Sequence, residues 1–169
     1  MPIRVRFLPI LGIVLAFGAV KALHVYEAQR VAVQCLRIPQ AHVLPQLLVG
    51  VLSTRVTVSD AQRSTLGWVD VSGLRRIDQI HLPGQRRTLH GQTASIGPLE
   101  SVAACFRRPV EGLVVSGHEV SSNGDRRYRV ADSATGQEYT VVLNRGLLIL
   151  LQRGEVRSAS FAHTTDVSH

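Results

Sequence analysis

Several residue types are scarce in this sequence, and each scarcity narrows what the protein can do. Only one of the 19 basic residues, Lys21, is a lysine, and aromatic residues make up 5% of the chain. Proteins that bind single-stranded nucleic acid stack bases on aromatic side chains in a strongly basic groove. Residues 23–169 contain 16 basic and 12 acidic residues, a net charge of only +4. We therefore do not expect nucleic acid as the partner.

The short motifs of common catalytic and metal sites are also missing. The sequence has no Gly-x-Ser-x-Gly turn, no His-x-x-x-His pair and no Cys-x-x-Cys pair. Cys105 with His90 or His118 would give a thiol and a base, and Glu111 and Glu119 flank one expected strand. A disulfide and solvated side chains explain these residues more simply. We expect no catalytic residues, no metal site and no cofactor, so the protein is not expected to be an enzyme.

Acidic residues are absent from the first 26 positions, where Arg4 and Arg6 precede a continuous apolar run over residues 7–20. A positive start, an apolar run and small residues at its end are the three parts of an export signal. A mitochondrial presequence of an inner-membrane subunit stays a minor alternative, although such presequences are amphipathic rather than continuously apolar. Residues 1–23 are therefore expected to target a membrane.

Small residues near the end of the run decide whether the segment is cut after export. Gly18 and Ala22 offer two cleavage points, although Lys21 makes the second a poor match. If uncut, residues 7–23 reach the lower limit of about 17 residues that a helix needs to cross a bilayer. We favour an uncut signal anchor. A cleaved signal peptide, giving a secreted or periplasmic protein, is the alternative.

Basic residues flank the apolar run on both sides. Arg4, Arg6 and the terminal amine precede it, and Lys21 and Arg30 follow it. The side richer in positive charge tends to stay in the cytoplasm. The small surplus before the run predicts a single-pass protein with its C-terminal domain outside the cytoplasm.

The sequence contains two cysteines, Cys35 and Cys105. An oxidising compartment outside the cytoplasm favours a disulfide between them, and it is the only intramolecular pairing that the chain allows. Two buried thiols are the alternative in a reducing compartment. The predicted bridge and the predicted compartment therefore depend on each other.

Apolar residues spaced by three and four positions from Val25 to Cys35 predict a helix that ends before Pro39. A chain of 169 residues is expected to form one core. Its last residues are rich in Ser, Thr and His, which favours fraying. The expected parts are a signal anchor or signal peptide (1–23), a helix extending from the anchor (24–38), a small β-rich domain (39–162) and a frayed tail (163–169).

After residue 53 the apolar period changes to two, with Val56 and Val58 alternating with polar residues. Two other stretches are ambiguous. Residues 42–52 form an apolar run interrupted by a proline and a glycine, and residues 74–82 have no clean period. The first half of the domain is therefore only partly assigned by its sequence.

The C-terminal half has a clearer pattern, in which Pro98 opens a short helix and four strand-like runs follow. Turn-forming residues separate the runs, and such close turns predict an antiparallel meander. The last run is apolar throughout and is expected to be buried on both faces. The sequence thus predicts an α+β fold with an N-terminal hydrophobic helix and a C-terminal antiparallel β-meander. The four runs are residues 112–120, 126–131, 138–143 and 147–151.

Paired arginines recur along the chain and have two interpretations. Guanidinium groups bind phosphate and carboxylate bidentately, so a stripe of them could contact an anionic lipid surface or a polysaccharide. Solvated arginines with nearby partners such as Asp78, Glu111 and Asp125 are the simpler interpretation. The residues considered for an anionic surface are Arg75, Arg76, Arg86, Arg87, Arg107 and Arg108.

Three small residues, Gly12, Ala16 and Ala19, share one face of the expected anchor. Membrane helices associate through small residues, which are also common in signal regions. We expect this face to meet a partner helix. The sequence predicts a membrane-anchored, non-catalytic subunit or accessory factor of a membrane or envelope assembly, with proteins and the lipid bilayer as partners. A secreted binding module and a small enzyme without a recognisable motif are the alternatives.

Overall fold

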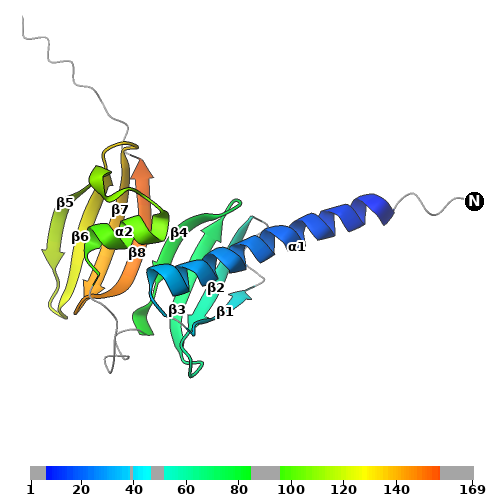
Figure 1. The fold of residues 1–169 in the computed structure, drawn as a ribbon, viewed down its shortest axis with the longest axis horizontal. Coiled ribbons are helices and arrows are strands. Elements are labelled where there is room, and N and C mark those ends of the chain that lie inside the picture. Colours follow the sequence, from blue (N-terminus) through cyan, green and yellow to red (C-terminus); the bar gives the residue numbers. More distant parts are fainter. Residues whose placement is uncertain (1–6, 39, 47–51, 85–95, 157–169) are drawn as a thin grey trace, which may run out of the picture.

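The computed structural model describes residues 7–38, 40–46, 52–84 and 96–156 (Figure 1). A long helix, α1 (Phe7–Arg30), continues into a π-helical turn, η1 (Val31–Cys35), and so ends before Pro39 as predicted. A second helix, α2 (Pro98–Phe106), and a short turn, η3 (Val110–Gly112), lie in the middle of the chain. The strands are β1 (His42–Gln46), β2 (Ser53–Ser59), β3 (Thr65–Ser72), β4 (Arg76–His81), β5 (Leu113–Val120), β6 (Asp125–Asp132), β7 (Gln137–Asn144) and β8 (Leu147–Val156).

These strands form one eight-stranded sheet in the order β1-β2-β3-β4-β8-β7-β6-β5, with antiparallel neighbours throughout. The predicted α+β fold class and the C-terminal meander are confirmed. A helix followed by four strands occurs twice, first as α1 with β1–β4 and then as α2 with β5–β8. The two units meet where β4 pairs with β8, which leaves β1 and β5 at the outer edges of the sheet.

Turn residues set the hairpins of the second unit. In the β7–β8 turn both Arg145 and Gly146 have positive φ, at 49° and 83°, which matches the twist of a two-residue hairpin. In the β6–β7 turn the Asp132 carboxylate accepts hydrogen bonds from the Ala134 N–H and the Thr135 hydroxyl. Short polar side chains of this kind stabilise turns locally, which is why the sequence could predict them.

Strand β8 lies between β4 and β7, in the middle of the sheet. Of its apolar run, Leu147, Leu148, Ile149 and Leu151 are buried and Leu150 is half-buried. The predicted burial of this run on both faces is confirmed. A strand with neighbours on both sides can bury residues that point to either face.

The ambiguous segments of the first unit become an edge strand and a bulged strand. Pro45 lies in β1, an edge strand, and edge strands tolerate proline because one of their sides has no neighbouring strand that needs an N–H donor. In β4, Ile77 pairs with Val71 and Gln79 pairs with Asp70, so one extra residue bulges between them. Ile77 and Ile80 can then both be buried although they are three residues apart, which explains the missing period.

The core lies between the sheet and the two helices, which cover the same face (Figure 1). Consecutive strands contribute one buried residue each in register, including Val56, Val69, Ile80 and Leu151. The last turns of α1 and η1 contribute Ala28, Val31, Ala32 and Cys35, and α2 contributes Val102 and Cys105. Helices and strands thus share one core.

Candidate functional site: the helix junction and the arginine cleft

The first part of α1 projects beyond the domain, with Ile10 through Ala19 exposed (Figure 1). Its large apolar side chains include Ile13 and Leu15, which are 70% and 64% exposed. The segment Ile10–Cys35 is long and apolar enough to cross a membrane. A helix with an exposed apolar surface of this extent is typical of a bilayer-spanning segment or of a signal sequence.

Where the helix enters the domain, three of its polar residues, Lys21, His24 and Glu27, are buried rather than exposed. Lys21, 7% exposed, donates hydrogen bonds from Nζ to the Ser53 carbonyl at 2.7 Å and to Thr54 Oγ1 at 2.9 Å. His24, fully buried, has Nδ1 at 2.7 Å from Thr54 Oγ1, and its Nε2 donates to the Gly73 carbonyl at 2.7 Å. Buried polar groups need partners of this kind. These contacts fix the helix against the start of β2 and against Gly73, which follows the end of β3.

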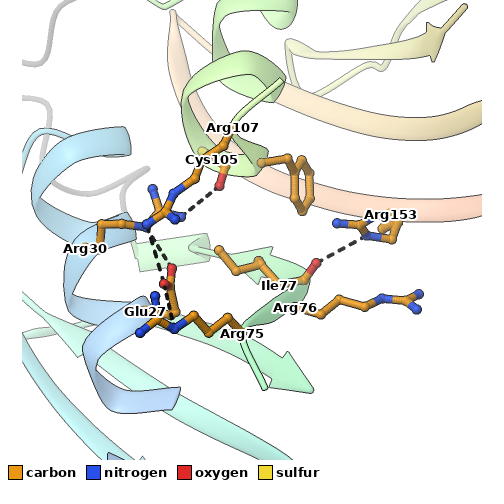
Figure 2. A pocket seen from close by; sticks show the side chains of 9 residues that line it. Glu27, Arg30, Arg75, Arg76, Ile77, Cys105, Arg107 and Arg153 are labelled. Carbon is orange, nitrogen blue, oxygen red and sulfur yellow. Dashed lines mark hydrogen bonds and ion pairs between the residues drawn. The ribbon is translucent and has the colours of Figure 1, made fainter. Parts of the chain in front are cut away.

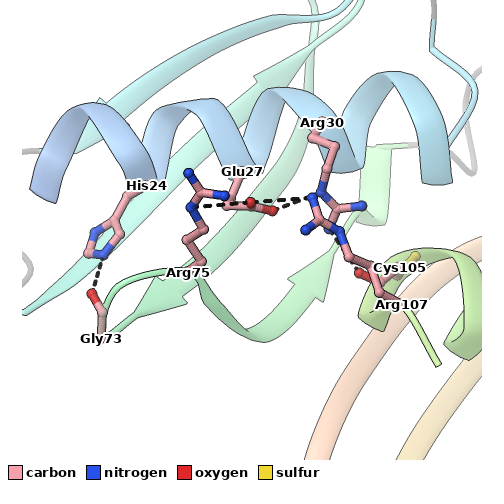
Figure 3. Close-up of polar contacts among 7 residues, drawn as sticks. All are labelled: His24, Glu27, Arg30, Gly73, Arg75, Cys105 and Arg107. Carbon is pink, nitrogen blue, oxygen red and sulfur yellow. Dashed lines mark hydrogen bonds and ion pairs between the residues drawn. The ribbon is translucent and has the colours of Figure 1, made fainter.

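One turn further along, Glu27 is 2% exposed and forms the centre of an ion-pair cluster (Figure 3). Its Oε2 lies 2.7 Å from Arg30 Nε on the same helix. Its Oε1 is approached by Arg107 at the end of α2, at 3.5 Å, and by Arg75 from the β3–β4 turn, at 3.9 Å. Arg30 also donates a hydrogen bond to the Cys105 carbonyl at 3.1 Å. The cluster therefore links α1, α2 and the β3–β4 turn.

These residues line a cavity of about 140 Å³ between the two helices and the sheet (Figure 2), which we call the arginine cleft. One glutamate faces five guanidinium groups there, and one of these, Arg76, pairs with Asp78 at 2.9 Å. Four guanidinium groups then remain for a single carboxylate. The cleft is strongly cationic, with Arg75 and Arg107 more than half exposed at its rim. Its lining residues are Glu27, Arg30, Arg75, Arg76, Ile77, Cys105, Phe106, Arg107 and Arg153.

Arg153, on β8, forms the wall of the cleft opposite Glu27 (Figure 2). Its guanidinium lies over the Phe106 ring, 5.0 Å from the centroid, and Nε donates to the Ile77 carbonyl at 3.4 Å. Within the described part of the chain, no carboxylate lies within ion-pair distance of it. Burial, together with repulsion from Arg76 and Arg108, lowers the pKa of Arg153 from its usual value. An anion in the cleft would relieve this unfavourable charge.

A disulfide between Cys35 and Cys105 joins the end of η1 to α2, with Cα atoms 5.1 Å apart. The predicted disulfide is confirmed. It lies directly beside the hydrogen bond from Arg30 to Cys105. The covalent link and the ion pairs therefore hold the same two helices together.

Two exposed leucines lie beside the helix junction. Leu52 precedes β2 and is 64% exposed, and Leu74 lies between β3 and β4 and is 69% exposed. The Gly73 N–H donates to the Leu52 carbonyl at 2.9 Å, so the residues next to the two leucines are in contact. Because Lys21 bonds to Ser53 and His24 to Gly73, both leucines lie close to α1 just after its exposed part.

The structure brings together only part of the predicted arginine set. Arg75, Arg76 and Arg107 line the cleft. Arg108 instead approaches Asp132 at 3.7 Å. Residues 86 and 87, the other predicted pair, lie outside the described residues. The arginines that the sequence analysis did not select, Arg30 and Arg153, complete the cleft.

The other sequence candidates that the structure describes do not line the cleft. Gly12, Ala16 and Ala19 lie on the projecting part of α1 and are exposed. His118 lies on β5, with its ring 5.0 Å from that of Tyr128, and Glu111 is exposed in η3. The remaining candidate, His90, falls outside the described residues. Within the described residues, no three His, Cys, Asp or Glu side chains gather as a metal site would require.

Sequence reasoning missed the buried polar stripe of α1, although a signal for it exists. Lys21, His24, Glu27 and Arg30 follow each other at three-residue spacing in a helix that is otherwise mostly apolar. Such spacing places polar groups along one side of a helix. The pattern alone does not say whether that side faces water or the interior, so the apolar positions between them dominated the interpretation.

No family model, curated protein or solved structure matches this chain.

Proposed function

We propose that this protein is a single-pass, membrane-anchored, non-catalytic subunit or accessory factor of a membrane or envelope protein assembly, with its α+β domain outside the cytoplasm. The observation that carries the proposal is the continuity of α1. One helix runs from an exposed apolar segment into the core of the domain, with no linker between them. A domain joined in this way has a fixed position and orientation relative to the bilayer, as a component of an assembly needs.

The junction supports a retained anchor. Cleavage after Ala22 would remove Lys21 and with it the two hydrogen bonds that it donates to the Ser53 carbonyl and to Thr54 Oγ1. Each intramolecular hydrogen bond contributes about 0.5–1.5 kcal/mol to stability. Cleavage after Gly18 would keep Lys21, so the membrane association itself has to be measured.

The disulfide supports the proposed compartment. A bridge that closes a 70-residue separation persists where thiols are oxidised, which is the environment outside the cytoplasm. Together with the apolar helix it favours export over a cytoplasmic location.

Carbonate extraction tests the anchor. Alkaline carbonate strips proteins that are held to membranes by charge but leaves bilayer-spanning helices in place. We expect the full-length chain to stay in the membrane pellet. Release into the supernatant, with a mature N-terminus near Leu23, would show a cleaved signal peptide and a secreted protein instead.

Co-purification tests the role in an assembly. Replacing both Gly12 and Ala16 with leucine keeps the helix apolar but fills the small-residue face, so partners should be lost while membrane localisation is kept. Gly18→Leu is the matched control because Gly18 lies on a different side of the helix, and in the described chain nothing lies within 4 Å of a Cβ at Gly12 or Gly18. Unchanged co-purification by the double variant would move the contact from the helix to the domain.

A further inference from the structure

The apolar part of α1 that precedes Lys21 is short for a bilayer. From residue 7 to residue 20 the helix rises about 20 Å, whereas a typical hydrocarbon core is about 30 Å thick. A helix that starts at one boundary at Phe7 reaches the other after about 20 residues, near Tyr26. The junction residues Lys21 and His24 then lie at the depth of the acyl chains, which is tolerable because both are buried inside the protein.

The described residues beside the junction have the apolar side chains that this depth requires. Leu52 lies beside Lys21 and Leu74 beside His24, and both leucines are exposed. Tyr26, 59% exposed, lies at the expected boundary, where aromatic side chains with a polar end are favoured. The apolar surface of the helix thus continues onto the domain.

The arginine cleft begins at the same boundary. Glu27 and Arg30 follow Tyr26 on the helix, and Arg75 follows the exposed Leu74. Arg75 also lies over the Tyr26 ring, 5.9 Å from its centroid. Beyond the hydrocarbon core the headgroup layer occupies roughly 5–7 Å on each side, which corresponds to three to five helical residues. The cleft is therefore at the level of lipid phosphates.

We infer that the arginine cleft binds the phosphate group of an anionic phospholipid, while Leu52 and Leu74 enter the acyl layer of the same leaflet. This inference rests on the proposed function, because the depth assigned to the cleft is measured along an anchored helix. Figure 2 shows Arg75 and Arg107 on one side of the cleft and Arg153 on the other, so an oxyanion between them meets guanidinium groups from two directions.

The charge of the cleft selects the lipid class. Glu27 is already bonded to Arg30 and cannot neutralise Arg75, Arg107 and Arg153 as well. A phosphate diester supplies the missing negative charge and accepts bidentate hydrogen bonds from guanidinium groups. In zwitterionic lipids a cationic headgroup already accompanies the phosphate, so lipids with uncompensated charge are preferred. The volume of about 140 Å³ accommodates one such group.

The test compares the thermal unfolding midpoint of the full chain in nanodiscs of phosphatidylcholine alone and of phosphatidylcholine with one quarter phosphatidylglycerol. Fluorescence of Trp68, the one tryptophan of the sequence, follows unfolding. We expect phosphatidylglycerol to raise the midpoint by roughly 3–6 °C, the shift for a site occupied about tenfold above half-saturation. Inorganic phosphate added to phosphatidylcholine nanodiscs should produce no comparable rise.

Two cleft variants and one control separate the site from general charge attraction. Arg107→Gln and Arg153→Gln, from opposite walls, should each lose most of the lipid-dependent rise. Arg127→Gln removes an exposed arginine from β6, on the sheet face away from the helices. This variant should keep the lipid-dependent rise. Each variant is compared with itself in the two lipids, so a lower absolute midpoint does not affect the result.

Three results would overturn the inference: no rise for the unaltered chain, an equal loss in Arg127→Gln, or an equal rise with inorganic phosphate, which would indicate a soluble anion as ligand. Failure of the proposed function looks different. If carbonate releases the chain but phosphatidylglycerol still stabilises it through Arg107, the lipid site stands and the anchor does not.

Discussion

Replacing Glu27 with glutamine tests whether the buried ion-pair cluster holds the anchor helix in the domain. Glutamine keeps the size of the side chain but removes its charge, leaving Arg30, 8% exposed, next to Arg75 and Arg107 without a carboxylate. Breaking a buried ion pair by removing one partner typically costs 3–5 kcal/mol. Because glutamine can still accept a hydrogen bond from Arg30, we expect a loss of about 3 kcal/mol in the free energy of unfolding.

Chemical denaturation of the full chain in detergent micelles, followed by Trp68 fluorescence, measures this loss. Asp78→Asn is the matched control, since it breaks the pair with Arg76 at the rim of the cleft, where the two side chains are 39% and 63% exposed. An exposed pair contributes about 0–1 kcal/mol. If Glu27→Gln costs no more than Asp78→Asn, the cluster does not hold the helix and our reasoning is wrong. Replacing Glu27 and Arg30 together with leucine and methionine should recover much of the loss, because Arg30 is then no longer a buried charge without a carboxylate.

Three further predictions concern the bridge, the membrane contact and the sheet. Cys105→Ser should lower the free energy of unfolding by about 4 kcal/mol, the value expected for a loop of this length, and alkylation without reduction should leave the mass of the unaltered protein unchanged. In a Trp68→Phe background, the tryptophan fluorescence of the Leu74→Trp variant should be quenched by brominated lipid chains. The fluorescence of the Val114→Trp variant, whose tryptophan is exposed on the distant edge strand β5, should not be quenched. Equal quenching of the two variants would contradict the proposed depth. Gly67→Ala should lower the free energy of unfolding by about 2 kcal/mol in the same denaturation assay, because a Cβ there would overlap the backbone at the end of β4. An unchanged midpoint would show that the two strands can move apart without loss of stability.

The sequence by itself determined the elements that depend on neighbouring residues. Arg145-Gly146 forms a turn because a two-residue hairpin needs positive φ, and Pro98 begins α2 because its missing N–H is not needed there. The apolar run of β8 could be expected to be buried on both faces, because five consecutive apolar residues leave no polar face for water. The apolar helix and the pairing of two cysteines followed from composition and elimination.

Only the tertiary structure decided how these elements meet. The pairing of β4 with β8 joins segments about 70 residues apart and turns two meanders into one sheet, and no local pattern specifies that partner. Arg30 and Arg153 come from opposite ends of the chain and reach the cleft only through that sheet and the disulfide. Nor does the spacing of Lys21, His24, Glu27 and Arg30 tell whether they face water or the interior. Whether a polar side chain is solvated or buried depends on the partners that other segments supply, and those partners, such as Thr54, Gly73 and Arg107, are far away in the sequence.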